Sequence, residues 1–171
     1  MSDNKLKVTI REEINLNGDS YDSLNINTLE NINEISKRIL TIPTGSEQEL
    51  VRFDSNVGSG TFINTDVKYM RFTNLGTVSS SFNPNDRLAV INITFKSFSE
   101  EEFAVKIPQG QTFLYNGVHP NGVSGSSMTA SGSALSSSLE EVYTSLSNIT
   151  VQTSGSGDCD LEYLIASATQ L

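Results

Sequence analysis

The chain has 171 residues, of which 18% are charged and 36% hydrophobic, with a formal net charge of −9, one cysteine and one histidine. This length fits one domain with a sizeable core, and the composition is not that of a disordered chain. The acidic balance argues against nucleic acid and against an anionic membrane surface, because both need clustered Lys and Arg. No basic residue follows Lys106, and a lone cysteine excludes an internal disulfide framework.

The N-terminal segment begins MSDNKLKVTI and lacks the apolar h-region of a signal peptide. No stretch of the chain reaches the length of a membrane span. We therefore expect a soluble product synthesised in the cytoplasm. In the same segment Leu6, Val8 and Ile10 alternate with polar residues, which predicts a first strand.

The next segment gives mixed signals. Leu29 and Ile32 fit helical spacing, and Asn27 and Glu30 stand at capping-box spacing. The stretch that follows is rich in β-forming residues and ends at a proline. We predict a short turn or helix near residues 28–33 and then a strand over residues 35–42.

Alternation with a period of two dominates the remainder of the chain. It is found at residues 50–53, 67–76, 89–95, 103–107, 111–116, 149–153 and 159–165. Short strands punctuated by Gly, Pro, Asn and Asp predict an all-β fold. We expect residues 1–171 to form a single antiparallel β-sandwich, jelly-roll-like, with at most one or two short helices.

Two segments echo each other. RILTIPTGSEQELVRF and EFAVKIPQGQTFLYN both consist of a strand, the turn Ile-Pro-x-Gly and a second strand. Similar strand pairs on opposite edges of a sandwich would produce this echo, and so would chance.

Residues 116–138 are rich in Gly and Ser and show no periodicity. Structureless loops of this length in compact domains tend to be functional or disordered. We interpret the segment as a binding or assembly arm. Helical spacing from Leu135 to Leu146 predicts a short helix after it, with Ser137 and Glu140 as a possible cap.

Cys159 is the first candidate for chemistry, because Asp158 and Asp160 flank it. In a strand, however, neighbouring side chains alternate between faces. Cys159 then shares a face with Leu161 and the apolar residues that follow, and the acids lie on the other face. We predict a buried structural thiol.

No catalytic constellation emerges from the other residues. His119 is the only histidine, which rules out His-rich metal sites, and it lies before a proline in the Gly/Ser-rich loop. The acid pairs near Glu100 and Glu140 are weak candidates for glycoside hydrolysis. We expect no enzyme activity, no cofactor and no metal site. Tyr69, Tyr115 and Tyr163 could stack on a sugar, but we interpret them as positions in the core or rim of the sandwich.

Three sequence segments resemble those of a known family. VKYMRFTNLGT, EFAVKIPQGQTFLYN and ITVQTSGSGDCDLEYLIAS follow one another in this order over about residues 65–168. A strand ending in R-x-T-N, a strand leading into a Pro/Gly turn, and a final hairpin with an acidic D-x-E-Y-L-I strand form the pattern. It resembles structural proteins of tailed bacteriophage particles, especially marine and cyanobacterial phages.

The resemblance implies a non-enzymatic virion subunit, made in the host cytoplasm, that decorates or cements the capsid shell. The alternative is a tail, neck or fibre component that binds carbohydrate on a host surface. Expected partners are the major capsid protein or other virion proteins, and further copies of the chain in a homo-oligomer, without nucleic acid or membrane. The residues expected at the assembly interface are Leu6, Val8, Ile10, His119, Asn121, Val123 and Met128.

Overall fold

The computed structural model describes residues 4–53, 61–63, 66–77, 89–98, 102–115, 146–154 and 157–168. The described residues form β-strands and turns and contain no α-helix. The strands are β1 (Lys5–Leu16), β2 (Asp19–Glu30), β3 (Glu34–Ile42), β4 (Gln48–Phe53), β5 (Thr61–Phe62), β6 (Val67–Thr77), β7 (Val90–Ser97), β8 (Glu102–Ile107), β9 (Thr112–Tyr115), β10 (Leu146–Ser154) and β11 (Cys159–Ser167).

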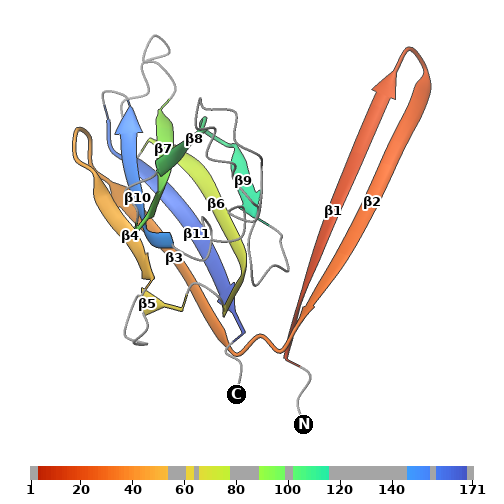
Figure 1. Ribbon diagram of the computed structural model, residues 1–171. Coiled ribbons are helices and arrows are strands. Elements are labelled where there is room, and N and C mark those ends of the chain that lie inside the picture. Colours follow the sequence, from red (N-terminus) through yellow and green to blue (C-terminus); the bar gives the residue numbers. More distant parts are fainter. Residues whose placement is uncertain are drawn as a thin grey trace, which may run out of the picture.

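The strands form two larger sheets and one separate hairpin (Figure 1). The five-stranded sheet has the order β5-β4-β10-β7-β8, and the four-stranded sheet has the order β3-β11-β6-β9. Together they form the body of the molecule. Their strands pair antiparallel, except for a short parallel pairing of β4 with β5. The all-β, antiparallel fold class predicted from the sequence is confirmed.

The body has one main core between its two sheets. On β7, Ile91 and Ile93 are fully buried, and on β11 Leu161 and Ile165 are fully buried and belong to the same cluster. Fully burying one such side chain contributes about 1.5–3 kcal/mol. The alternation seen in the sequence therefore marks the inward face of each strand, because successive side chains point to opposite faces.

Among the residues that the structure describes, Asn74 is the one fully buried side-chain amide. Its Nδ2 donates to the carbonyls of Ala89 and Ile107, each at 2.9 Å, and its Oδ1 accepts from the backbone N–H of Gly76 at 2.9 Å. Ala89 leads into β7 and Ile107 ends β8, so one side chain on β6 ties the two sheets together. Gly76 has φ +104°, a value that favours glycine.

The two Ile-Pro-x-Gly turns carry the chain between the sheets at opposite edges. Ile42-Pro43-Thr44-Gly45 connects β3 of the four-stranded sheet to β4 of the five-stranded sheet. Ile107-Pro108-Gln109-Gly110 connects β8 to β9 in the reverse direction on the other side. In the described part of the chain β3, β8 and β9 are edge strands of their sheets, and β4 lies next to the edge strand β5. The repeated pattern in the sequence therefore corresponds to two crossings between the sheets, on opposite sides of the body.

Of the short turn or helix predicted near residues 28–33, the helix is wrong, and the chain leaves the strand only at residues 31–33, where Asn31 has φ 60°. Residues up to Glu30 belong to β2, which pairs with β1 in register, and Leu29 lies opposite Leu6. This pairing places Leu29 in a buried cluster, and that tertiary contact outweighs the weak local helix signal. The strand predicted over residues 35–42 is confirmed as β3. The helix predicted from Leu135 to Leu146 lies almost wholly outside the described residues, and Leu146 begins β10.

Candidate functional site

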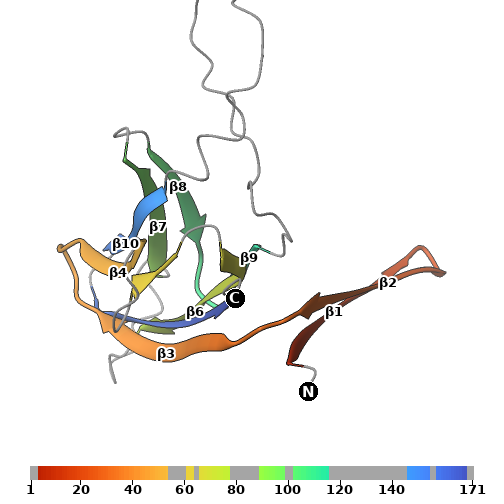
Figure 2. The ribbon, with the colours of Figure 1, turned by 60° about the horizontal axis from the view of Figure 1, so that its bottom comes forward.

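The most distinctive feature is the hairpin of β1 and β2, here called the arm, which extends away from the body (Figures 1 and 2). Its ladder runs without a register shift from Lys5 opposite Glu30 to Leu16 opposite Asp19. Twelve residues of extended chain measure roughly 40 Å. The turn is Asn17-Gly18, with φ values of 55° and 91°. Positive φ at both positions defines the type I′ turn that suits a two-residue hairpin loop.

The base of the arm is fixed to the body. Val8 and Leu29 pack in a second buried cluster with Tyr69, Ala166 and Ala168, on the outer face of the four-stranded sheet. Leu6 and Ile10 are partly buried against the same cluster. This attachment covers Leu6, Val8 and Ile10 on the apolar face of β1, and it leaves Ile14 and Leu16 on the same face exposed.

Backbone hydrogen bonds reinforce this attachment. The N–H of Asn33, between the arm and β3, donates to the carbonyl of Ser167 at 3.1 Å. The N–H of Ala168 donates to the carbonyl of Asp66 at 2.8 Å. The connection between arm and body is therefore built from both packing and hydrogen bonds.

The far half of the arm, here called the distal arm (residues 11–26), exposes large apolar side chains on both of its faces. Because directly opposed residues share a face, Ile14 and Tyr21 form a pair that continues the apolar face of the arm base. Leu24 and Ile26 lie on the opposite face. Five side chains here are between 51 and 62% exposed: Ile14, Leu16, Tyr21, Leu24 and Ile26.

A two-stranded hairpin on its own is marginally stable in water, and clustered exposed apolar side chains are typical of interaction surfaces. The acids of the distal arm are Glu12, Glu13, Asp19 and Asp22. Arg11 is its only base, and its guanidinium lies 2.5 Å from Glu13. The distal arm is thus apolar and acidic at once.

A second exposed apolar feature lies on β3. Ile35 and Ile39 are each 59% exposed, and by strand parity both lie on the outer face of the four-stranded sheet. Lys37 stands between them on the same face, and Arg38, also exposed, lies on the opposite face of the strand. β3 is an edge strand of its sheet in the described part of the chain. Edge strands present unpaired backbone groups and are natural sites of strand addition.

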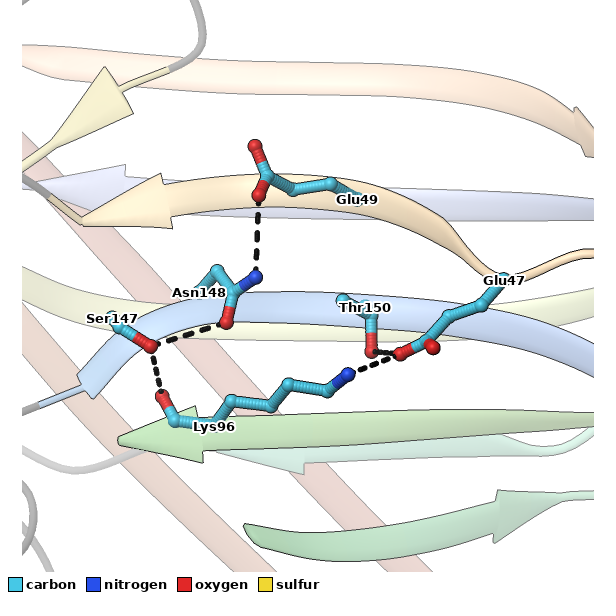
Figure 3. A network of polar contacts seen from close by, with 6 residues as sticks. All are labelled: Glu47, Glu49, Lys96, Ser147, Asn148 and Thr150. Atoms are coloured by element: carbon cyan, nitrogen blue, oxygen red, sulfur yellow. Dashed lines mark hydrogen bonds and ion pairs between the residues drawn. The ribbon is translucent and has the colours of Figure 1, made fainter. Parts of the chain in front are cut away.

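The outer face of the five-stranded sheet is polar (Figure 3). Glu47 accepts hydrogen bonds from Lys96 Nζ and Thr150 Oγ1, each at 2.5 Å. These bonds hold the pKa of Glu47 below its usual value against the opposing effect of burial, and the bond to Glu47 raises the pKa of Lys96. Asn148 Nδ2 donates to Glu49 at 3.2 Å.

Beside this network lies an open hollow of about 340 Å³, lined by Glu49, Arg52, Phe53, Phe98, Ser147 and Asn148. Phe98 is 67% exposed, so its ring offers a stacking surface next to hydrogen-bonding groups. By contrast, Tyr69 and Tyr163 are buried and Tyr115 packs against the main core. The core interpretation of these tyrosines is confirmed.

The prediction for Cys159 is confirmed. The thiol is buried, and burial together with the charges of Asp158 and Asp160 raises its pKa. The two acids point to polar partners instead: Asp158 accepts from the backbone N–H of Thr44 at 3.0 Å, and Asp160 accepts from Thr41 Oγ1 at 2.7 Å. Among the described residues, no group of three or more His, Cys, Asp and Glu is arranged to hold a metal ion.

The residues predicted for assembly divide into two groups. Leu6, Val8 and Ile10 lie at the arm base, where their contacts are to the body of the same chain. The others, His119, Asn121, Val123 and Met128, lie with the whole 116–138 loop outside the described residues. An intermolecular role for either group stays a prediction.

Sequence reasoning missed the distal arm. The dipeptide Asn17-Gly18 between two alternating runs was the available signal, since it is the strongest short-range indication of a hairpin. A scan against protein-family models finds no match, and searches of curated proteins and of solved structures find none either. Within the described residues no helix has the length and apolar character needed to cross a membrane.

Proposed function

We propose that this protein is a non-enzymatic structural subunit of a tailed-phage virion, a jelly-roll-like decoration or cement protein on the outer shell. Its partners are the major capsid protein or other virion proteins, and it is made in the host cytoplasm. The resemblance of the strand phrases motivates the virion setting. The single observation that carries the assembly role is the distal arm, which leaves five large apolar side chains in solvent.

The physical argument starts from the cost of that exposure. A strand pair with apolar side chains on both faces gains stability when another surface covers it. The rigid body supports the arm through the buried cluster around Leu29. The proposal contains no catalytic step and no cofactor, and the acidity of the chain suits a surface that faces away from packaged DNA.

Copy number tests this proposal directly. Quantitative mass spectrometry would be applied to virions purified from infected cells in which the chain is made. Hundreds of copies per particle support shell decoration, whereas a dozen or fewer support the neck, tail or fibres. Absence of the chain from purified particles contradicts the proposal.

A second candidate function is carbohydrate binding at the hollow beside Phe98, as in a host-recognition component of a tail or fibre. The exposed ring and the neighbouring Asn148 and Glu49 favour it, because sugars bind by stacking and hydrogen bonding. Screening the isolated chain on a glycan array, with Phe98→Ala and the control Leu75→Ala, tests this candidate. Saturable binding lost only in Phe98→Ala supports it, and the absence of any binding contradicts it.

A further inference from the structure

The outer face of the four-stranded sheet is only half covered. Leu164 and Ala166 of β11 lie opposite Lys37 and Ile35 of β3 in the ladder. The two β11 residues belong to the cluster beneath the arm base, either within it or packed against it. The neighbouring isoleucines of β3 remain exposed. An arm therefore already packs on one half of this face, and the other half, along β3, is bare.

We propose that the distal arm of one copy packs on this bare half of a second copy, next to β3. The inference deepens the proposed assembly function and rests on it. The chain's own distal arm extends away from the body (Figures 1 and 2), so it does not cover the chain's own β3 surface. The uncovered surface continues an existing interface between an arm and this sheet, and a second arm has the matching chemistry.

Charge supports the same occupant. The distal arm carries four carboxylates and one guanidinium, and the latter pairs with Glu13. On the outer face of β3, Lys37 lies between the two isoleucines, and Lys37 and Arg71 both pair with the single carboxylate of Glu162. In a chain with a net charge of −9, two cations around one carboxylate let an acidic arm approach this part of the face.

The backbone supports it as well. β3 has a free edge within the described part of the chain, and each strand of the arm has one. A strand of the arm that pairs with this edge lies beside β3 in the sheet, and its outward apolar side chains then pack along Ile35 and Ile39. Every copy then donates one arm and accepts another. Such a heterologous contact closes into a ring or continues as an open array.

Two double variants separate the donor from the acceptor. The donor variant is Ile14→Ser with Tyr21→Ser, the acceptor variant is Ile35→Ser with Ile39→Ser, and Leu75→Ser is the control at a residue 47% exposed. Native mass spectrometry and light scattering measure the oligomeric state over a range of concentrations. We expect wild type and control to oligomerise, and each double variant to raise the dissociation constant at least tenfold. A mixture of the two variants should form a dimer, because it retains one intact donor and one intact acceptor.

Cross-linking provides a measurement that does not depend on the serine variants folding. Cys159 is buried, so a cysteine introduced by Leu16→Cys and another by Ile39→Cys are the thiols open to reagent. A mixture of the two single variants should give a covalent dimer with a short bis-maleimide. Leu16→Cys mixed with Leu75→Cys is the control and should give little.

The outcomes distinguish the two proposals. If the acceptor variant oligomerises like wild type, or the cross-link fails, the β3 surface is not the acceptor. If wild type stays monomeric at all concentrations yet joins virions through its arm, the inference fails and the proposed function survives. If the donor variant changes neither the oligomeric state nor incorporation into virions, both fail.

Discussion

β7 in the body and β1 in the arm are built on the same alternation, yet their apolar faces differ in what covers them. On β7, Ile91 and Ile93 are fully buried between the two sheets. On β1, Val8 is buried at the base, while Ile14 and Leu16 are more than half exposed. The comparison teaches that alternation of apolar and polar residues predicts a strand with one apolar face. It does not predict which surface covers that face, because this depends on where the fold places the strand. In the distal arm, the described residues of the chain leave that face exposed.

The largest expected effect lies in the body. Asn74→Leu removes the three buried hydrogen bonds that the amide makes to the carbonyls of Ala89 and Ile107 and to the N–H of Gly76. Each unsatisfied buried group costs about 1–3 kcal/mol, so the free energy of unfolding should fall by about 3 kcal/mol or more. Urea denaturation measures this loss. The control is Asn92→Leu, because Asn92 Oδ1 has no hydrogen-bond partner in the part of the chain that the structure describes. Equal losses in the two variants would contradict the role assigned to Asn74.

The next prediction compares the loss of stability at the base of the arm with that in the distal arm. Leu29→Ala at the base removes a side chain that is 2% exposed and should cost about 2 kcal/mol or more. Leu24→Ala in the distal arm should cost less than about 0.5 kcal/mol in dilute monomer. Thermal unfolding compares the two, and limited proteolysis should cut the arm faster only in Leu29→Ala. A similar loss in both variants would mean that the distal arm is covered within the chain.

Cys159→Ser should have a moderate effect. The substitution buries a hydroxyl in place of a thiol and should lower the free energy of unfolding by about 1–3 kcal/mol. Cys159→Ala is the control, since it removes volume without burying a polar group. In the wild type, a thiol reagent should label the protein only as it unfolds. Rapid labelling under native conditions would place the thiol at the surface.

The smallest effect concerns the polar face of the five-stranded sheet. The pKa of Glu47 is held below 4.5, so the carboxylate stabilises the fold above that pH and loses its contribution as the pH falls through the lower folded value. The pKa of Lys96 is raised above 10.5, so its contribution is present below that pH and is lost as the pH rises through the higher folded value. At pH values between 4.5 and 10.5, Glu47→Gln should therefore lower the free energy of unfolding by less than about 1 kcal/mol.

Denaturation at a series of pH values checks this expectation. The difference in unfolding free energy between wild type and Glu47→Gln should shrink at both acidic and strongly alkaline pH. A difference that stays constant across the series would show that the ion pair does not contribute.

Much of the body follows from the sequence because its strands satisfy a simple rule. Alternating residues such as Ile91 and Leu161 have an inward face, and the acids around Cys159 fall on the outward face. The buried thiol and the paired Ile-Pro-x-Gly turns could be predicted for this reason. Asn74 could not, because only the fold brings its side chain to the ends of β7 and β8.

The arm was harder to predict because local and tertiary signals disagree there. Leu29 and Ile32 have helical spacing, but pairing with β1 and packing against Tyr69 make the segment extended. The exposure of Ile35 and Ile39 depends on where β3 lies in the order of strands, which alternation does not encode. Asn17-Gly18 indicates the turn, and no local pattern indicates that the hairpin leaves the body.

The ladder between β3 and β11 also has a mechanical consequence. The arm joins the body through residues 31–33 and through its packed base, so a force applied to its tip reaches Glu34, the first residue of β3, once the base contacts yield. β3 is paired to β11 over nine residues without a shift, from Glu34 opposite Ser167 to Ile42 opposite Cys159. A pull along β3 loads these pairs in shear, so they must yield together instead of opening one by one.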